Sequence, residues 1–195
     1  MNRHPILLVH GFGDTLGIFR VMTGYFEDLG FPVRSLDLIP SNGTVGLDVL
    51  AKQLASYIDR AFGSDTPFDL IGFSMGGLVS RYYVQRLGGV DRVRKLITIS
   101  SPHNGTLTAY VFARPGCLQM RPNSAFLQDL NRDAIEILSQ VDFTSIWTPY
   151  DLMIVPASSS HLPVGKEIQI PVFLHAWMVG DRRCLDAIAG LLSDE

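Results

Sequence analysis

The chain has 195 residues, of which 47% are hydrophobic and 18% are charged, and its formal net charge is −3 at pH 7. This length predicts one domain, 1–195, with a sizeable hydrophobic core. A chain this apolar either buries most of its surface or keeps an apolar face exposed. No basic cluster favours nucleic-acid binding, and no apolar run is long enough to span a bilayer.

Short apolar runs and amphipathic runs alternate over the first half of the chain. The short runs predict strands over 6–9, 31–38, 68–73 and 93–100. Between them, apolar residues at helical spacing predict helices over 17–29, from 44 or 46 to 62, and over 75–87. This alternation indicates parallel βαβ units with helices on both faces of the sheet, which is an α/β fold.

The pattern changes after the fourth predicted strand. Residues 101–121 form a loop rich in proline and glycine that contains the apolar stretch 107–113. The segment 101–126 is long enough to cover a site, so it predicts a small lid or pocket wall, or else ordinary core beneath a loop. Further along we expect a helix capped by Ser124 that ends near 139, strands over 143–147 and 168–174, and a closing helix over 181–192.

One stretch at a predicted strand end carries reactive chemistry. Gly72-Phe73-Ser74-Met75-Gly76 places a serine two residues from a glycine on either side. Small neighbours permit a sharp strand-to-helix turn, and the start of the helix offers free N–H groups and a positive dipole end. We interpret this stretch as a nucleophile elbow rather than a glycine-rich loop with an incidental serine.

A serine hydroxyl needs a base, and the base needs an acid that orients it. In elbow hydrolases the order along the chain is serine, acid, histidine, so His103, His161 and His175 are the candidate bases. We favour His175, because it follows the last predicted strand at the carboxyl edge, where parallel sheets place their sites. His161 is expected at the surface, and His103 is expected to be a structural or substrate-side residue.

The favoured acid is Asp151, which follows the predicted strand 143–147 after a short turn and precedes an apolar loop. Asp142 lies at the opposite, amino edge of that strand. Asp91 and Glu167 are the remaining alternatives outside the helices. Three further acidic residues share one predicted helix face that we expect to be solvated: Asp129, Asp133 and Glu136.

Acyl transfer also requires hydrogen-bond donors aimed at the developing oxyanion. The predicted donors are the backbone N–H of Met75, which follows the nucleophile, and that of Phe12 in the glycine-containing loop after the first strand. His10, just before this loop, is expected to hydrogen-bond loop backbone. The predicted substrate-binding residues are apolar, which favours an acyl chain over a charged substrate: Phe12, Phe73, Leu107, Tyr110, Met153 and Ile154.

Several motifs occur in an order that resembles the α/β-hydrolase superfamily, and most closely the small bacterial triacylglycerol lipases and esterases. They are His-Gly-Phe-Gly at 10–13, the elbow, Ser-Pro-His-Asn-Gly-Thr at 101–106, Tyr-Asp-Leu-Met-Ile-Val at 150–155, and the late histidine. The resemblance implies a triad of Ser74, Asp151 and His175, with oxyanion donors at Phe12 and Met75. It also implies a minimal, about six-stranded parallel sheet without a large cap domain, and a reaction that needs no metal or other cofactor.

The expected function is therefore that of a serine carboxylic ester hydrolase that acts on lipid or acyl esters through an acyl-enzyme. An acyltransferase or thioesterase with the same triad is the alternative, and a non-catalytic hydrolase-fold binding module is a third. The expected partner is a small-molecule or lipid ester, with transient contact with a lipid interface, and no obligate protein partner is evident.

Two expectations concern the cell compartment and the thiols. The apolar run 6–9 is too short for the core of a signal peptide, so the sequence as given favours a cytoplasmic protein, with a processed secreted form as the alternative. Cys117 and Cys184 are far apart and lack metal-ligand spacing. They are expected to be two buried thiols, with a single disulfide as the alternative.

Overall fold

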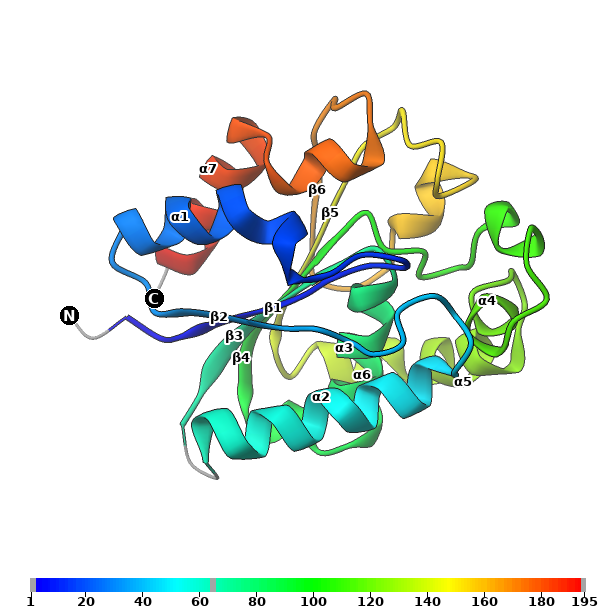
Figure 1. Ribbon diagram of the computed structural model, residues 1–195, viewed down its shortest axis with the longest axis horizontal. Coiled ribbons are helices and arrows are strands. Elements are labelled where there is room, and N and C mark those ends of the chain that lie inside the picture. Colours follow the sequence, from blue (N-terminus) through cyan, green and yellow to red (C-terminus); the bar gives the residue numbers. More distant parts are fainter. Residues whose placement is uncertain (1–2, 64–65, 194–195) are drawn as a thin grey trace.

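The computed structural model describes residues 3–63 and 66–193, and within them six strands form one parallel sheet (Figure 1). The strands lie in the order β2-β1-β3-β4-β5-β6, and each neighbouring pair is parallel. This confirms the predicted six-stranded parallel sheet. Their bounds are β1 (Ile6–Val9), β2 (Val33–Leu36), β3 (Phe68–Phe73), β4 (Val93–Ile99), β5 (Asp142–Trp147) and β6 (Lys166–Gln169).

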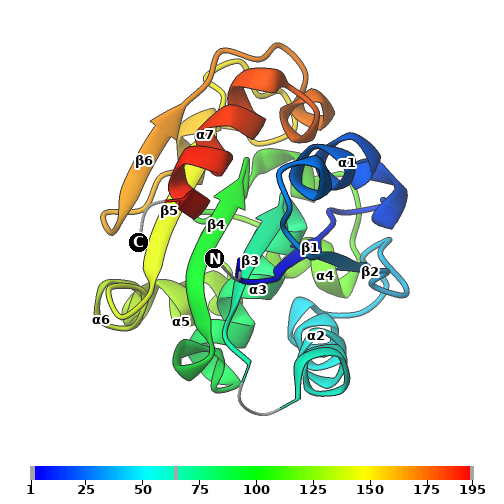
Figure 2. The same ribbon diagram turned by 90° about the vertical axis from the view of Figure 1, so that its left-hand side faces the viewer.

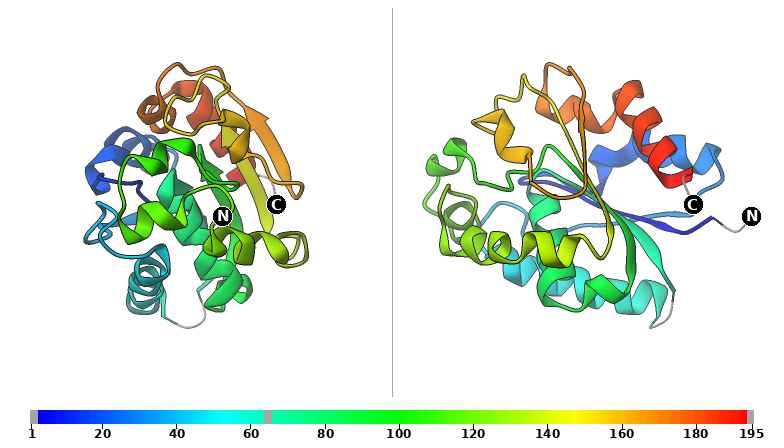
Figure 3. Two further views of the ribbon diagram at one scale, coloured as in Figure 1. Left: turned by 90° about the vertical axis from the view of Figure 1, so that its right-hand side faces the viewer. Right: turned by 180° about the vertical axis from the view of Figure 1, so that it is seen from behind.

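Helices cover both faces of the sheet, as predicted (Figure 2). One face carries α1 (Arg20–Asp28) and α7 (Arg182–Ser193). The view from behind shows these two on the opposite side of the sheet from α2 and α3 (Figure 3). The other face carries α2 (Leu47–Phe62), α3 (Met75–Arg86), α5 (Ala125–Arg132) and α6 (Ala134–Leu138). No helix within the described part of the chain is long and apolar enough to cross a membrane.

Strand β1 is apolar throughout because both of its faces are covered. In β1 the side chains of Ile6 and Leu8 join the hydrophobic cluster beneath α1 and α7, whereas Leu7 and Val9 join the cluster against α2 and α3. All four are fully buried. The alternation of side chains along a strand therefore divides the core into two layers, one on each face of the sheet.

The segment 101–121 is more ordered than the loop that the sequence predicted. It contains the 3-10 helix η3 (Leu107–Tyr110), which Thr106 caps by accepting a hydrogen bond from Thr108 N–H, and the α-helix α4 (Pro115–Gln119). Both helices are too short to show a clear periodicity in the sequence. Figure 1 shows α4 beyond the carboxyl ends of the strands.

Two other element predictions are corrected. The helix expected from Ser124 to 139 begins at its predicted cap, since Ser124 Oγ accepts from Leu127 N–H, but it is divided into α5 and α6 at Asp133, where φ is −120°. The strand expected over 168–174 spans only Lys166–Gln169. Pro171 has no N–H to continue the ladder, so residues 170–174 form an irregular connection.

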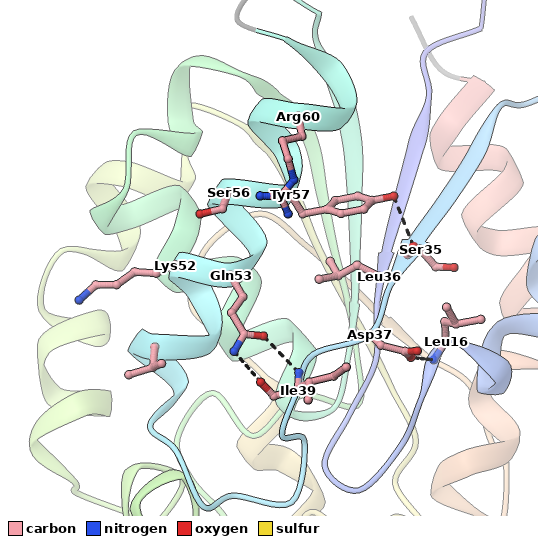
Figure 4. A pocket seen from close by; sticks show the side chains of 11 residues that line it. Leu16, Ser35, Leu36, Asp37, Ile39, Lys52, Gln53, Ser56, Tyr57 and Arg60 are labelled. Atoms are coloured by element: carbon pink, nitrogen blue, oxygen red, sulfur yellow. Dashed lines mark hydrogen bonds between the residues drawn. The ribbon is translucent and has the colours of Figure 1, made fainter.

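The β2 edge of the sheet borders an open groove of about 720 Å³ between β2 and α2 (Figure 4). The Gln53 side chain accepts a hydrogen bond from Ile39 N–H at 3.1 Å and donates one to Ile39 C=O at 2.6 Å. The Tyr57 hydroxyl donates to Ser35 C=O at 3.4 Å. Tyr57 of α2 thus occupies a backbone carbonyl of the edge strand β2, and Gln53 holds the chain just after that strand.

Candidate active site

Ser74 lies at the turn between β3 and α3 with φ 54° and ψ −123°, a conformation that a non-glycine residue rarely adopts. The positions two residues before and after Ser74 must be glycine, because backbone atoms lie too close to them for a side chain. A Cβ added to Gly76 would lie 2.2 Å from Val9 O, and one added to Gly72 would lie 2.6 Å from Gly77 Cα. The strand and helix are therefore close enough to force the strained turn of a nucleophile elbow.

The Asp151 carboxylate is fully occupied by hydrogen bonds. One oxygen accepts from the N–H groups of Met153 and Ile154, at 2.9 Å each, and the other lies 2.7 Å from His175 Nδ1. The Asp151 side chain is buried and that of His175 is largely buried. These two residues, chosen from the sequence as acid and base, are therefore paired in the structure.

The electrostatics of this pair favour an ionised acid. Burial alone would raise the pKa of Asp151, but the hydrogen bond and charge of His175, together with the two N–H groups, lower that pKa below its usual value. An ionised carboxylate can only accept, so His175 Nδ1 carries the proton. The lone pair of His175 Nε2 is then available to accept a proton from another group.

His175 begins the 3-10 helix η5 (His175–Val179), six residues after β6 ends. The sequence placed it directly after a strand, and that detail is wrong. It nevertheless lies beside the elbow, because the Phe73 ring stands 4.8 Å from the imidazole ring. The Ser74 hydroxyl forms no hydrogen bond with another described residue, and in free enzymes the nucleophile-to-base contact often shortens only when substrate binds.

The two predicted oxyanion donors come from the elbow and from the loop after β1. Met75 is the first residue of α3, so its N–H has no partner within the helix. Phe12 lies in the loop after β1, which is held by a hydrogen bond from Gly13 N–H to Ser41 C=O. Among the described residues no acceptor binds the N–H of Met75 or Phe12.

His10 and His161 have other partners. His10 Nε2 accepts from Leu38 N–H at 2.9 Å, so Nδ1 must carry the proton that it donates to Gly11 C=O. This confirms that His10 binds loop backbone. His161 is half exposed and its Nδ1 lies 3.0 Å from a Glu167 carboxylate oxygen, as expected of a surface residue.

His103 is completely buried and its ring nitrogens face structural partners. Arg81 donates to Nδ1 at 3.3 Å, so Nε2 carries the proton and donates to Thr98 Oγ1 at 2.9 Å. Burial, reinforced by the charge of Arg81, lowers the pKa of His103 well below its usual value. Of the two roles that the sequence left open, the structure supports the structural one.

The buried His103 predicts a loss of stability in acid. The unfolded chain binds a proton near pH 6.5, whereas the folded chain resists protonation until a much lower pH. The contribution of His103 to the free energy of unfolding is therefore fully present above pH 6.5. It falls as the pH decreases below 6.5, by at most about 1.4 kcal/mol per pH unit. Urea unfolding at pH 8 and pH 5 should show a smaller acid loss in His103→Gln than in the natural chain. Equal losses would contradict this assignment.

Three of the other acidic candidates form ion pairs away from the elbow. Asp129 and Asp133 bind the Arg86 side chain at 2.8 and 2.9 Å, so the helix face on which they lie is not simply solvated. Asp142, at the amino end of β5, lies 3.1 Å from Lys95 Nζ. No group of three or more His, Cys, Asp or Glu side chains that could hold a metal ion is found in residues 3–63 and 66–193.

A cavity of about 270 Å³ opens beside Ser74. Of the predicted substrate-binding residues, Phe12, Met153 and Ile154 line it, whereas Phe73 does not, and Leu107 and Tyr110 are each 55% exposed outside it. Val111, Phe112 and Met120 also line it, and they lie in the segment that the sequence predicted as a lid or pocket wall. The sequence missed five further lining residues because they lie in segments without a clear period: Pro102, Thr106, Thr108, Ala109 and Cys117. The walls are mostly apolar, as the sequence predicted.

The cavity wall and the acid are physically connected. Thr106 Oγ1 and Thr108 Oγ1 both donate to Met153 C=O, at 2.9 and 2.6 Å, and Leu107 N–H donates to Val155 C=O.

Cys117, which also lines the cavity, is a free buried thiol, and so is Cys184. The disulfide alternative is therefore excluded.

Comparison with known proteins finds one matching family model and several similar sequences. The family model for palmitoyl protein thioesterase matches residues 5–120. A triacylglycerol lipase of Pseudarthrobacter phenanthrenivorans is 30% identical over 113 residues, which are 54% of this chain and 35% of that protein. A triacylglycerol lipase of Burkholderia plantarii is 30% identical over 113 residues, which are 54% of this chain and 31% of that protein. The chain thus matches about a third of the length of these curated relatives.

Solved structures share the fold over nearly the whole chain. The mature form of a Bacillus licheniformis lipase matches with a TM-score of 0.80 and 15% identity, covering 99% of this chain and 93% of that one. Aspergillus fumigatus lipase B matches with a TM-score of 0.83 and 18% identity, covering 99% of this chain and 53% of that one. At such identities the likeness concerns the fold alone.

Proposed function

Because the chain belongs to the palmitoyl protein thioesterase family and has the lipase- and esterase-type α/β-hydrolase fold, we propose that it is a serine hydrolase of acyl esters. Ser74 is the nucleophile, His175 the base and Asp151 the acid that orients it. The observation that carries this proposal is the buried Asp151–His175 pair, 2.7 Å apart, beside the strained elbow of Ser74.

The proposed reaction has two steps. His175 Nε2 takes the Ser74 proton as Oγ attacks the acyl carbonyl carbon, and the N–H groups of Phe12 and Met75 stabilise the oxyanion. His175 then returns the proton to the leaving oxygen, and the acyl group remains on Ser74 as an ester. Water, deprotonated by His175, releases the acid in the second step. Asp151 stays ionised throughout and stabilises the imidazolium.

The cavity beside Ser74 supports an acyl chain as the bound part of the substrate. Its volume of about 270 Å³ accommodates roughly nine groups the size of a water molecule, each about 30 Å³, and a methylene group is of similar size. Exposed apolar side chains surround the site, among them Leu152, Met153, Phe173 and Trp177. They favour transient contact with a lipid interface where such esters reside.

A thioesterase is the second candidate, since the matching family model carries that description. The same triad serves both reactions, because only the leaving atom changes from oxygen to sulfur. Octanoyl p-nitrophenyl ester and an octanoyl thioester of a small neutral thiol test the two directly, with Ser74→Ala as control. Hydrolysis of neither substrate above the control would refute the proposal, and the ratio of kcat/KM values decides between ester and thioester.

The cavity predicts a chain-length effect for Ala109→Leu, which adds bulk to the wall. Two or three methylene groups of an octanoyl chain should be displaced into water, at about 0.8 kcal/mol each. The ratio of kcat/KM for octanoyl over acetyl p-nitrophenyl ester should therefore fall by about tenfold or more. Ala113→Leu makes the same change at an exposed residue outside the cavity and should leave this ratio unchanged. An unaltered ratio in Ala109→Leu would mean that the acyl chain binds elsewhere.

A further inference from the structure

Asp14 places a second carboxylate beside the elbow, apart from the Asp151–His175 pair. A Cβ added to Gly11 would lie 3.0 Å from Ser74 Cβ and 3.1 Å from Asp14 Oδ2. The Ser74 and Asp14 side chains therefore lie next to the same side of Gly11. The Asp14 side chain is close enough to His10 and His175 that protonation of either imidazole would lower the pKa of Asp14. Asp14 follows Gly13 in the loop that carries the proposed oxyanion donor Phe12.

This carboxylate has no partner that would explain its position. Asp14 is half-buried, yet within the described ranges neither of its carboxylate oxygens accepts a hydrogen bond or forms an ion pair. Burial raises the pKa of Asp14 and the charges of His10 and His175 only partly oppose this. By contrast, the nearby Asp37 carboxylate accepts from Leu16 N–H at 2.5 Å. Neither Asp14 oxygen is among the fully buried unpartnered atoms of the described residues, so both are open to solvent, and a donor on a bound substrate could replace the water that binds them.

Asp14 lies on the side of Ser74 where the leaving group of an ester would bind. The acyl cavity begins at Ser74, and neither Asp14 nor His175 lines it. His175 must lie on the leaving-group side of Ser74, because it returns the proton to the leaving oxygen. Asp14, near both Ser74 and His175 but outside the cavity, therefore borders the space for the leaving group.

We propose that Asp14 selects the leaving group of the substrate: it accepts hydrogen bonds from a hydroxylated alcohol, attracts a cationic one by its charge and repels an anionic one. This proposal rests on the proposed ester hydrolysis and adds the chemical class of the leaving group. A carboxylate accepts hydrogen bonds from alcohol hydroxyls, and it attracts a quaternary ammonium such as that of choline through opposite charge. A phosphate or carboxylate on the leaving group would meet a like charge.

The test is a series of octanoyl esters that differ only in the alcohol: ethyl, 2-hydroxyethyl, choline and 2-carboxyethyl. For the natural chain we expect kcat/KM of the hydroxyethyl and choline esters to exceed that of the ethyl ester, and the carboxyethyl ester to be poorest. Asp14→Asn should lower the choline-to-ethyl ratio by about tenfold, because it removes the charge, while its side-chain oxygen still accepts from a hydroxyl. Asp14→Ala should also lower the hydroxyethyl-to-ethyl ratio.

Asp28→Asn, which removes an exposed carboxylate at the far end of α1, controls for net charge and should change no ratio. Ratios that are the same in Asp14→Asn and in the natural chain would overturn the proposal. An equal loss on all four esters would also overturn it, since Asp14 would then act on His175 rather than on the alcohol. Failure of ester hydrolysis as such is recognised separately, by p-nitrophenyl ester activity that does not exceed that of Ser74→Ala.

Discussion

Replacement of His175 by alanine is expected to lower kcat for octanoyl p-nitrophenyl ester by about 10⁴- to 10⁶-fold, the range found when a triad member is removed. In the proposed reaction the imidazole supplies both the base for Ser74 and the acid for the leaving group, so its removal takes away both roles. The Asp151 carboxylate would lose its 2.7 Å partner but keep the N–H groups of Met153 and Ile154. The chain should therefore still fold, which circular dichroism and thermal unfolding would verify.

His161→Ala is the matched control for this experiment. The His161 side chain is half exposed and pairs with Glu167 at the surface, so its removal should leave kcat within about twofold and stability within about 0.5 kcal/mol. Activity that is lost in His161→Ala and retained in His175→Ala would overturn the assignment of the base. A loss in both, with both proteins folded, would show that the site extends to the loop of His161.

Gly76→Ala should have the largest effect on folding. The added Cβ would lie 2.2 Å from Val9 O and 2.5 Å from His10 O, and these are backbone atoms of β1 that cannot turn away. Either α3 moves off the sheet or the loop after β1 shifts, and both change the elbow. We expect a loss of about 3 kcal/mol or more in the free energy of unfolding, measured with urea, together with loss of ester hydrolysis.

Gly190→Ala makes the same substitution where there is room for it. Gly190 lies within α7, and nothing stands within 4 Å of the Cβ that would be added. Alanine favours helix over glycine by about 0.5–1 kcal/mol, so this variant should be equally stable or more stable. Similar stability losses in the two variants would contradict the close-contact argument for Gly76.

The features that could be predicted from the sequence depend on local patterns. Strand β3 is buried on both faces and is followed at once by a helix, and its predicted bounds agree with the structure. Asp151 and His175 could be chosen because parallel strands bring their carboxyl ends to one edge, and the structure brings these two residues into contact. Chain order and sheet geometry were sufficient for that choice.

The remaining features depend on contacts between distant segments. The cavity wall is formed by short helices in 101–121 that are held by hydrogen bonds to 153–155, and no periodic pattern shows such a contact. The exposed edge strand β6 has little apolar signal, so its end was misplaced by several residues. Asp14 directly follows the His-Gly-Phe-Gly motif, but whether its carboxylate has a hydrogen-bond partner among the described residues is visible only in three dimensions.

The short segment after Asp151 serves two purposes with the same residues. Met153 and Ile154 hold the carboxylate through their N–H groups, while their side chains line the cavity. Thr106 and Thr108 bind the same segment from the opposite wall. The fit of the acyl chain and the alignment of the base are therefore mechanically linked. Substitutions at these positions will not divide cleanly into binding and catalytic effects, and kcat and KM should change together.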